Sequence, residues 1–126
     1  MKRIFIVLLA LNLSSCIIAY NNFLTKNRQS LMRLKIGMTK AEVNQIMGTG
    51  GINTIDHKIN NPYRSEIFRG KEKSFEIWYY VTDKKGRYYA ITDDELTPLI
   101  FDEDKLVGWG QGFLSDIIIK YEIRIR

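Results

Sequence analysis

A capping box, Thr39-Lys40-Ala41-Glu42, constrains the fold of this chain more than any other local feature. In such a box the Thr hydroxyl accepts a hydrogen bond from the Glu amide, and the Glu carboxylate accepts one from the Thr amide. Met38 and Val43 stand where a hydrophobic staple would place two apolar residues. Gly48 suits the left-handed conformation that ends many helices. The sequence therefore predicts a helix over Lys40–Met47.

Alternating apolar and polar residues after this helix indicate β-strands. The clearest run is Ser74 to Thr82, in which every second residue is apolar and would lie on one face of a sheet. Three consecutive Ile residues before Lys120 favour a strand over a helix near the C-terminus. Further strands are predicted, with short turns between them, at Thr97–Phe101, Leu106–Gly110 and Ile119–Arg126. Tyr63–Arg69 and Arg87–Thr92 are weaker candidates, for a short strand and for an extension of the hairpin.

Helices that precede all the strands define the expected fold class. Phe23 to Leu34 has its Leu residues on one helical face and is predicted to form a first helix. Ile52–Pro62 is polar and predicted to be a loop, and Gln111–Asp116 a connector. We expect an α+β fold with two N-terminal helices packed on one face of an antiparallel sheet of three to five strands. Residues 23–126 would form a single domain.

The first sixteen residues have the pattern of a lipoprotein signal. Lys2 and Arg3 precede an apolar run that is too short to cross a bilayer. Leu13-Ser14-Ser15-Cys16 then follows the bacterial lipobox pattern of an apolar residue, two small residues and a cysteine. We expect a signal peptide over 1–15, acyl chains on Cys16 and a short tether over 16–22. An ordinary signal peptide, or a buried helix with a chance cysteine, is the alternative.

Removal of the signal peptide would change the length and net charge from which a functional class is inferred. The chain has 126 residues and a net charge of +5. Removal of residues 1–15 takes away Lys2 and Arg3, so 111 residues with 17 basic and 14 acidic side chains remain, a net charge of +3. Ile17, where an Asp would favour the inner membrane, points to the outer membrane facing the periplasm. We expect no nucleic-acid partner there.

The residues that most often carry chemistry are sparse. With one Cys and one His, an intramolecular disulfide and a protein-only Cys/His zinc site are excluded. His57 lies in a polar loop without a nucleophile to activate. Two acidic clusters, Asp93–Glu95 and Asp102–Asp104, fall at predicted turns and lack the spacing of a calcium loop. We expect no catalytic residue, no metal site and no cofactor.

Aromatic residues are the best candidates for contacts with a partner. Trp78 and Tyr80 lie on the face of the predicted strand opposite Phe75, Ile77 and Tyr79, and Trp109 would join them. Trp and Tyr dominate interface hot spots, which favours a partner-binding patch. Aromatic residues are also common in strands, where they cover the second face of a thin sheet. Both interpretations stay open.

Several of these features together resemble a known family. Leu34-Lys35-Ile36-Gly37-Met38-Thr39-Lys40-Ala41-Glu42-Val43, the Met47-Gly48 stop, the aromatic strand Phe75–Tyr80 and the hairpin Phe101–Val107 are similar to small outer-membrane lipoproteins of the BamE (SmpA/OmlA) type. The resemblance implies two helices on a three-stranded antiparallel sheet. Its best-known member is a non-enzymatic accessory lipoprotein of the complex that inserts β-barrels. This chain departs from it at Gly48-Thr49-Gly50, where Gly-x-Pro is usual.

The lipobox and this resemblance together set the expected function. The leading hypothesis is a non-enzymatic, lipid-anchored scaffold or protein-interaction module of the cell envelope, with outer-membrane assembly or envelope integrity as the expected role. The alternative is a periplasm-facing inhibitor or ligand-binding lipoprotein. An enzyme is the third hypothesis, and the absence of a nucleophile–base pair argues against it.

Overall fold

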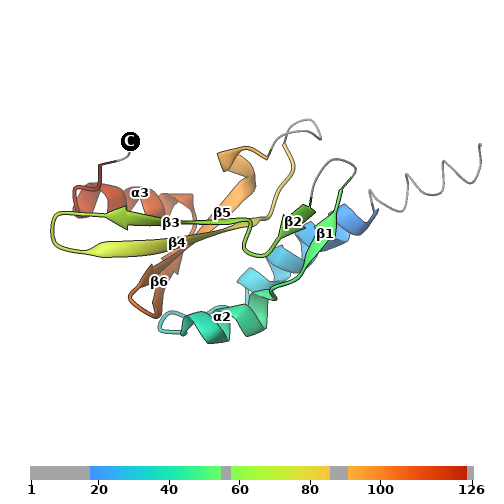
Figure 1. The fold of residues 1–126 in the computed structure, drawn as a ribbon, viewed down its shortest axis with the longest axis horizontal. Coiled ribbons are helices and arrows are strands. Elements are labelled where there is room, and N and C mark those ends of the chain that lie inside the picture. The colour runs from blue at the N-terminus through green and yellow to red at the C-terminus, as the bar shows by residue number, and fades with distance from the viewer. Residues whose placement is uncertain (1–17, 55–57, 86–90, 125–126) are drawn as a thin grey trace, which may run out of the picture.

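The computed structural model describes residues 18–54, 58–85 and 91–124. Cys16 and His57 lie outside these residues, as do most of the predicted strand Arg87–Thr92. The described part begins with a helix over 18–31. The other elements are α2 (Lys40–Met47), β1 (Gly51–Asn53), β2 (Lys58–Asn60), β3 (Arg64–Arg69), β4 (Ser74–Val81), the short 3-10 helix η1 (Asp93–Glu95), β5 (Leu96–Asp102), β6 (Lys105–Trp109) and α3 (Gln111–Lys120) (Figure 1).

Four strands form an antiparallel meander in the order β3-β4-β5-β6. Each strand pairs with the next along the chain, as short connections favour. A shift in register between Ile100 and Phe101 marks a bulge in the pairing of β5 with β6. A separate two-stranded sheet pairs β1 with β2. The α+β class and the antiparallel sheet are therefore confirmed.

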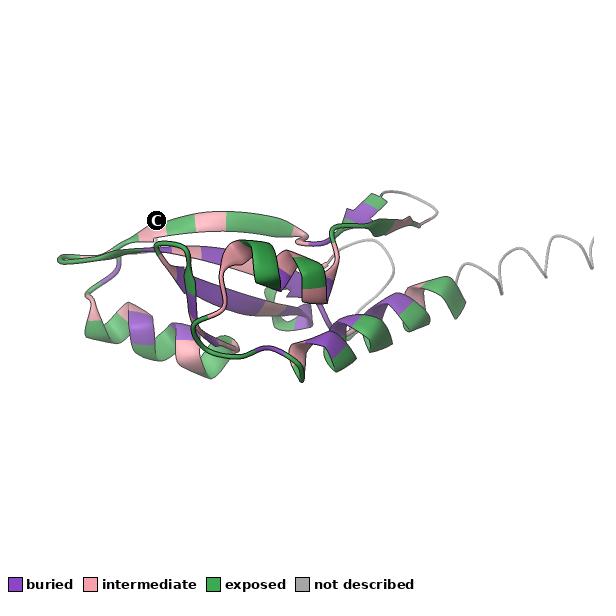
Figure 2. Cartoon of the chain, turned by 90° about the horizontal axis from the view of Figure 1, so that it is seen from below, coloured by how far each residue is buried: buried purple, intermediate pink, exposed green. Residues whose placement is uncertain are grey.

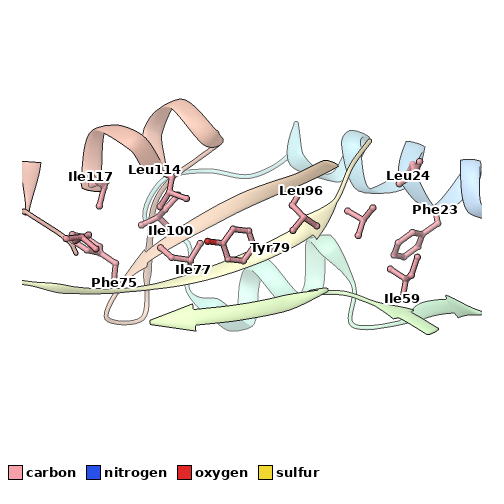
Figure 3. Close-up of a cluster of buried hydrophobic side chains, with 12 residues drawn as sticks. Phe23, Leu24, Ile59, Phe75, Ile77, Tyr79, Leu96, Ile100, Leu114 and Ile117 are labelled. Atoms are coloured by element: carbon pink, nitrogen blue, oxygen red, sulfur yellow. The ribbon is translucent and has the colours of Figure 1, made fainter. Parts of the chain in front are cut away.

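The two faces of the four-stranded sheet bury two different clusters. On one face, the residues of β4 from Phe75 to Val81 that alternate along the strand pack against Leu114 and Ile117 of α3. Phe23 and Leu24 of the first helix join this first cluster at the far end of the sheet (Figure 3). On the other face, Val43 and Met47 of α2 pack with Leu34, Tyr80, Leu99, Phe101 and Leu106, which we call the α2-face cluster.

This arrangement corrects the expectation that both N-terminal helices share one face. The second helix covers one face of the sheet, and α3 covers part of the other (Figure 1). The first helix lies at the end of the sheet and contributes Phe23 to the first cluster, while Leu31, its last residue, and Leu34, just beyond it, pack in the α2-face cluster. The apolar residues of β4 alternate, but Trp78 and Tyr80 on its second face also pack in a cluster, so both faces need a helix to exclude water.

The second helix forms as predicted, with the same bounds. The Thr39 hydroxyl accepts the Glu42 amide at 3.2 Å, and the Glu42 carboxylate accepts the Thr39 amide at 3.4 Å. At the other end Gly48 has φ of 78° and donates its amide to Asn44. Local hydrogen bonding at both ends therefore determines where α2 begins and ends.

The prediction for the C-terminal region is wrong. Gln111–Lys120, predicted as a connector running into a strand, is the helix α3, and the residues after it to 124 are not in a strand. Leu114 and Ile117, three residues apart, are buried on the sheet, whereas Ile119 is 77% exposed. A helix places Leu114 and Ile117 on one stripe that packs on the apolar face of β4 and β5. The burial of this stripe outweighs the preference of Ile for strands.

Smaller differences concern element bounds. The first helix covers 18–31 where 23–34 was predicted, and the predicted loop at 52–62 contains the strands β1 and β2. The predictions for β3, β4, β5 and β6 agree with the structure to within one residue at each end. In the described residues, no helix combines the length and apolar character that crossing a bilayer requires.

Candidate functional site

The three predicted contact aromatics lie on one face of the sheet. Trp78 of β4 is opposite Leu99 of β5, which is opposite Trp109 of β6, so the three form one row across three strands. Tyr80 lies two residues along β4 from Trp78 and therefore projects from the same face. The expectation that these aromatics share a face is confirmed.

Tyr80 is a core residue and not a surface contact. Its side chain has no exposed area and packs with the residues of α2 in the α2-face cluster. Its hydroxyl finds no hydrogen-bond partner among the described residues. Burial raises the pKa of this hydroxyl well above its usual range. The assignment of Tyr80 as a partner-binding residue is therefore corrected: a side chain under α2 has no surface to offer.

Trp78 and Trp109 keep partial exposure at the margins of the same cluster. The ring of Trp78 lies 4.7 Å from that of Phe101, at a tilt of 55°. Lys40 of α2 forms an ion pair with Glu76 and lies 5.8 Å from the centre of the Phe101 ring. The two Trp side chains thus border α2, and their role in partner contacts stays a prediction.

A buried pair of amides joins the first helix to the sheet. The Asn27 side chain donates to Asn61 at 3.1 Å and to the Val81 carbonyl at 2.9 Å. In return Asn61 donates to Asn27 at 2.8 Å and to the Met47 carbonyl at 3.0 Å. Both side chains are buried, so these bonds satisfy groups that water cannot reach. Sequence reasoning missed this pair, because 34 residues separate its members.

A cleft of about 290 Å³ opens between the first helix and the loop after α2. One wall is a helical stripe of four residues, and the other is the glycine-rich segment with its neighbours. The lining residues are Ala19, Asn22, Phe23, Lys26, Met47, Gly48, Gly50, Gly51, Ile52 and Asn61. Its floor is mainly apolar and Lys26 supplies a cation, a combination that suits a small amphiphilic ligand.

A group of charged side chains lies near strand β3, on the face of the sheet that carries the first cluster. Arg64 contacts Asp93 at 2.8 Å and Glu66 at 3.6 Å, and its guanidinium lies 4.5 Å from the centre of the Tyr79 ring. The Tyr79 hydroxyl donates to Glu66 at 3.3 Å. Burial, and then the charge of Glu66, raise the pKa of Tyr79 to about 12. One guanidinium thus faces two carboxylates and lies against Tyr79, which belongs to the first cluster.

The acidic turns have structural roles. Asp93 pairs with Arg64, Asp102 accepts from Lys73 at 2.8 Å, and Glu95 accepts the hydroxyl of Thr92 at 2.9 Å. Across the ranges 18–54, 58–85 and 91–124, no three His, Cys, Asp or Glu side chains gather as a metal ion would require.

Positive charge is concentrated at the N-terminal end of the chain. Residues 1–41 include seven Lys or Arg and no Asp or Glu, so all 14 acidic residues come later. Lys26 and Arg28 are exposed on the first helix. The count was available from the sequence, but only the structure shows that this helix protrudes at one end of the molecule (Figure 1).

Comparison with known proteins adds a family without a known activity. A family model described as "Protein of unknown function (DUF3192)" matches residues 18–116. No curated protein and no solved structure matches the chain. The matched segment starts with the first helix and ends within α3, so it includes both layers that cover the sheet.

Proposed function

We propose that this chain, which belongs to the DUF3192 family of proteins of unknown function, is a lipid-anchored interaction module of the bacterial cell envelope. In this proposal Cys16 carries the acyl chains and the domain faces the periplasm from the outer membrane. The domain acts by holding a protein partner and not by catalysis. The resemblance to BamE-type lipoproteins supports this kind of role.

The observation that carries the proposal is the lipobox immediately before the folded domain. Leu13-Ser14-Ser15-Cys16 is followed by Ile17 alone before the helix described from residue 18. Two residues span at most about 7 Å of extended chain. An acylated Cys16 would therefore hold the first helix close to the lipid, and two or three acyl chains make such an anchor stable.

Charge distribution supports the same orientation. After cleavage before Cys16, residues 16–41 hold five Lys or Arg and no Asp or Glu, and Lys26 and Arg28 are exposed on the helix nearest the anchor. Basic side chains near a membrane surface are attracted to anionic head groups. The remaining sequence, with 14 acidic residues, would face away from the lipid.

The anchor is tested by replacing the acylated residue. Cys16→Ala is expected to abolish labelling with an alkyne fatty acid and to leave the unprocessed precursor. Ser15→Ala is the matched control, since it keeps a small residue before the cysteine and should be labelled and cleaved normally. Correct processing and membrane retention of Cys16→Ala would show that the anchor assignment is wrong.

The interaction role is tested at the two partly exposed tryptophans. A photo-cross-linking residue at Trp78 or Trp109 is expected to capture one defined envelope protein in intact cells. The same residue at Met32, which is 86% exposed and outside the α2-face cluster, is the control. Capture of barrel-assembly components from the tryptophans alone supports the proposal. Equal capture from all three positions contradicts it.

The cleft favours a second candidate, a ligand-binding lipoprotein. Its apolar floor and Lys26 would hold a small amphiphile with an anionic group. Native mass spectrometry of the protein extracted from membranes would then show a bound small molecule. Ala19→Trp, which fills the cleft, should remove it, whereas Thr25→Trp, exposed but not in the lining, should not.

A further inference from the structure

The two edges of the four-stranded sheet differ in whether another segment of the chain forms backbone hydrogen bonds with them. Outside β6, Gly37 donates its amide to the Leu106 carbonyl at 2.7 Å, and Leu106 donates to the Met38 carbonyl at 2.8 Å. Thr39 also bridges to Lys105. The segment before α2 therefore closes this edge. Strand β3, at the opposite edge, pairs only with β4 among the residues that the structure describes.

Strand β3 has the properties of an edge that accepts another strand. It runs for six residues in unbroken register with β4 and contains no proline. Its residues are exposed or half-buried along the whole strand (Figure 2). The closest contacts of α3 with the sheet fall on β5 and β6, whereas Tyr121, just after α3, accepts the amide of Lys71 in the turn that follows β3. Ile67 is 62% exposed at its centre. Edge strands present unpaired backbone groups, and natural proteins usually protect them.

The strand is complementary to a second copy of itself in one register. In an antiparallel pair, opposed side chains lie on the same face. The two-fold axis of a symmetric pair must therefore lie between one residue and the same residue of the second copy. An axis at Glu66 would oppose two carboxylates, which is unfavourable. Axes at Ser65 or Phe68 would pair three residues of β3. An axis at Ile67 pairs five residues and opposes no like charges.

We propose that β3 pairs antiparallel with β3 of a second copy, with Ile67 opposite its counterpart, to form a continuous eight-stranded sheet. Ser65 then lies opposite Arg69 of the second copy, and the exposed Ile67 is buried against its equivalent. Five residues per strand bury less area than a standard interface, so the pair is weak in solution. Pairing itself does not require the lipid anchor.

The geometry has a consequence that rests on the proposed function. The first helix lies at the end of the sheet where β3 begins (Figure 1). An antiparallel pair therefore places the two first helices at opposite ends of the joint sheet. Two anchored copies would pair with their strands lying along the membrane surface, where anchoring raises their effective concentration.

Cysteine cross-linking of the full chain, in membranes and after detergent extraction, tests the register. Ile67→Cys is expected to give at least about tenfold more oxidised dimer than Ser65→Cys, because a disulfide needs Cβ atoms roughly 4 Å apart. In this register the two Ser65 positions are offset by four residues, about 13 Å along the strands. A mixture of Ser65→Cys and Arg69→Cys chains should cross-link with each other. The parent chain, whose one cysteine is Cys16, is the control for any dimer that forms through that residue.

Each result decides the proposal. Dimers from Ile67→Cys, and from the Ser65→Cys and Arg69→Cys mixture, support it, and Ile67→Lys should then abolish cross-linking in the mixture. Stronger cross-linking from Ser65→Cys alone would mean a different register and overturn the proposal. Equal cross-linking of both single variants would indicate random collision, and no cross-linking would show that β3 does not self-pair. The anchor test at Cys16 is read separately, so either idea can fail alone.

Discussion

The amide pair of Asn27 and Asn61 is expected to hold the first helix onto the sheet. Asn27→Ala removes both bonds between the two side chains and the bond to the Val81 carbonyl. Asn61→Ala removes the same two bonds and the one to the Met47 carbonyl. Each substitution leaves buried polar groups without partners, which costs more than the loss of an exposed hydrogen bond.

The magnitude follows from the number of groups left unsatisfied. Each buried orphan costs about 1–3 kcal/mol, so either single substitution should lower the free energy of unfolding by about 2–4 kcal/mol. The two substitutions share the reciprocal bonds, and the double variant leaves fewer orphans than the two single variants together. Its loss should therefore fall short of the sum by about 1–2 kcal/mol. Asn22→Ala, exposed on the same helix, should stay within about 0.5 kcal/mol of the parent.

A urea titration followed by tryptophan fluorescence measures all four variants. Trp78 and Trp109 report on the α2-face cluster, so the transition follows the sheet core and not a local change at Asn27. The reasoning is wrong if Asn27→Ala costs no more than Asn22→Ala. It is also wrong if the losses of Asn27→Ala and Asn61→Ala add, since additivity would mean that the two side chains are independent.

Three further predictions use the same titration. Tyr80→Phe removes a buried hydroxyl that has no partner and should raise the free energy of unfolding by about 1 kcal/mol, whereas Tyr79→Phe, which loses the bond to Glu66, should not. Because the pKa of Tyr79 rises from its ordinary 10.0 to about 12 on folding, the contribution of Tyr79 to stability should be constant below pH 10 and fall between pH 10 and 12 as the unfolded state ionises first. Burial also raises the pKa of Tyr80, which adds to the alkaline loss, so Tyr79→Phe should remove about 2–3 kcal/mol of that loss, and an unchanged alkaline slope in this variant would contradict the assignment. Gly48→Ala, at φ of 78° and ψ of 159°, a region almost restricted to glycine, should cost about 1–3 kcal/mol, and an unchanged midpoint would show that the helix end tolerates a side chain there.

Sequence reasoning succeeded where the determining contacts are local. Helix α2 was predicted with its observed bounds because Thr39, Glu42 and Gly48 fix its ends within the helix itself. The strands β3 to β6 follow from alternation and short turns, which also dictate the order of a meander. No information from distant residues is needed for either.

It failed where distant surfaces decide the outcome. The three Ile residues of α3 favour a strand locally, and only the apolar face of β4 and β5 makes a helical stripe with Leu114 and Ile117 more stable. Tyr80 was chosen as a contact because it shares a face with Trp78, and the sequence does not show that α2 covers that position. The pairing of Asn27 with Asn61 likewise depends on how the first helix meets the sheet.

The segment from Leu34 to Val43 carries the resemblance to BamE-type lipoproteins, and its contacts explain its pattern without a partner. Leu34 and Val43 are buried in the α2-face cluster, and Thr39 caps α2. Gly37 and Met38 bond to Leu106 and close the β6 edge. One short segment thus begins a helix, fills a core and protects a strand. A chain that needs all three will keep such residues whatever it binds. Tests of the proposed interaction role therefore belong outside that segment, at Cys16, at the two tryptophans and at the edge strand β3.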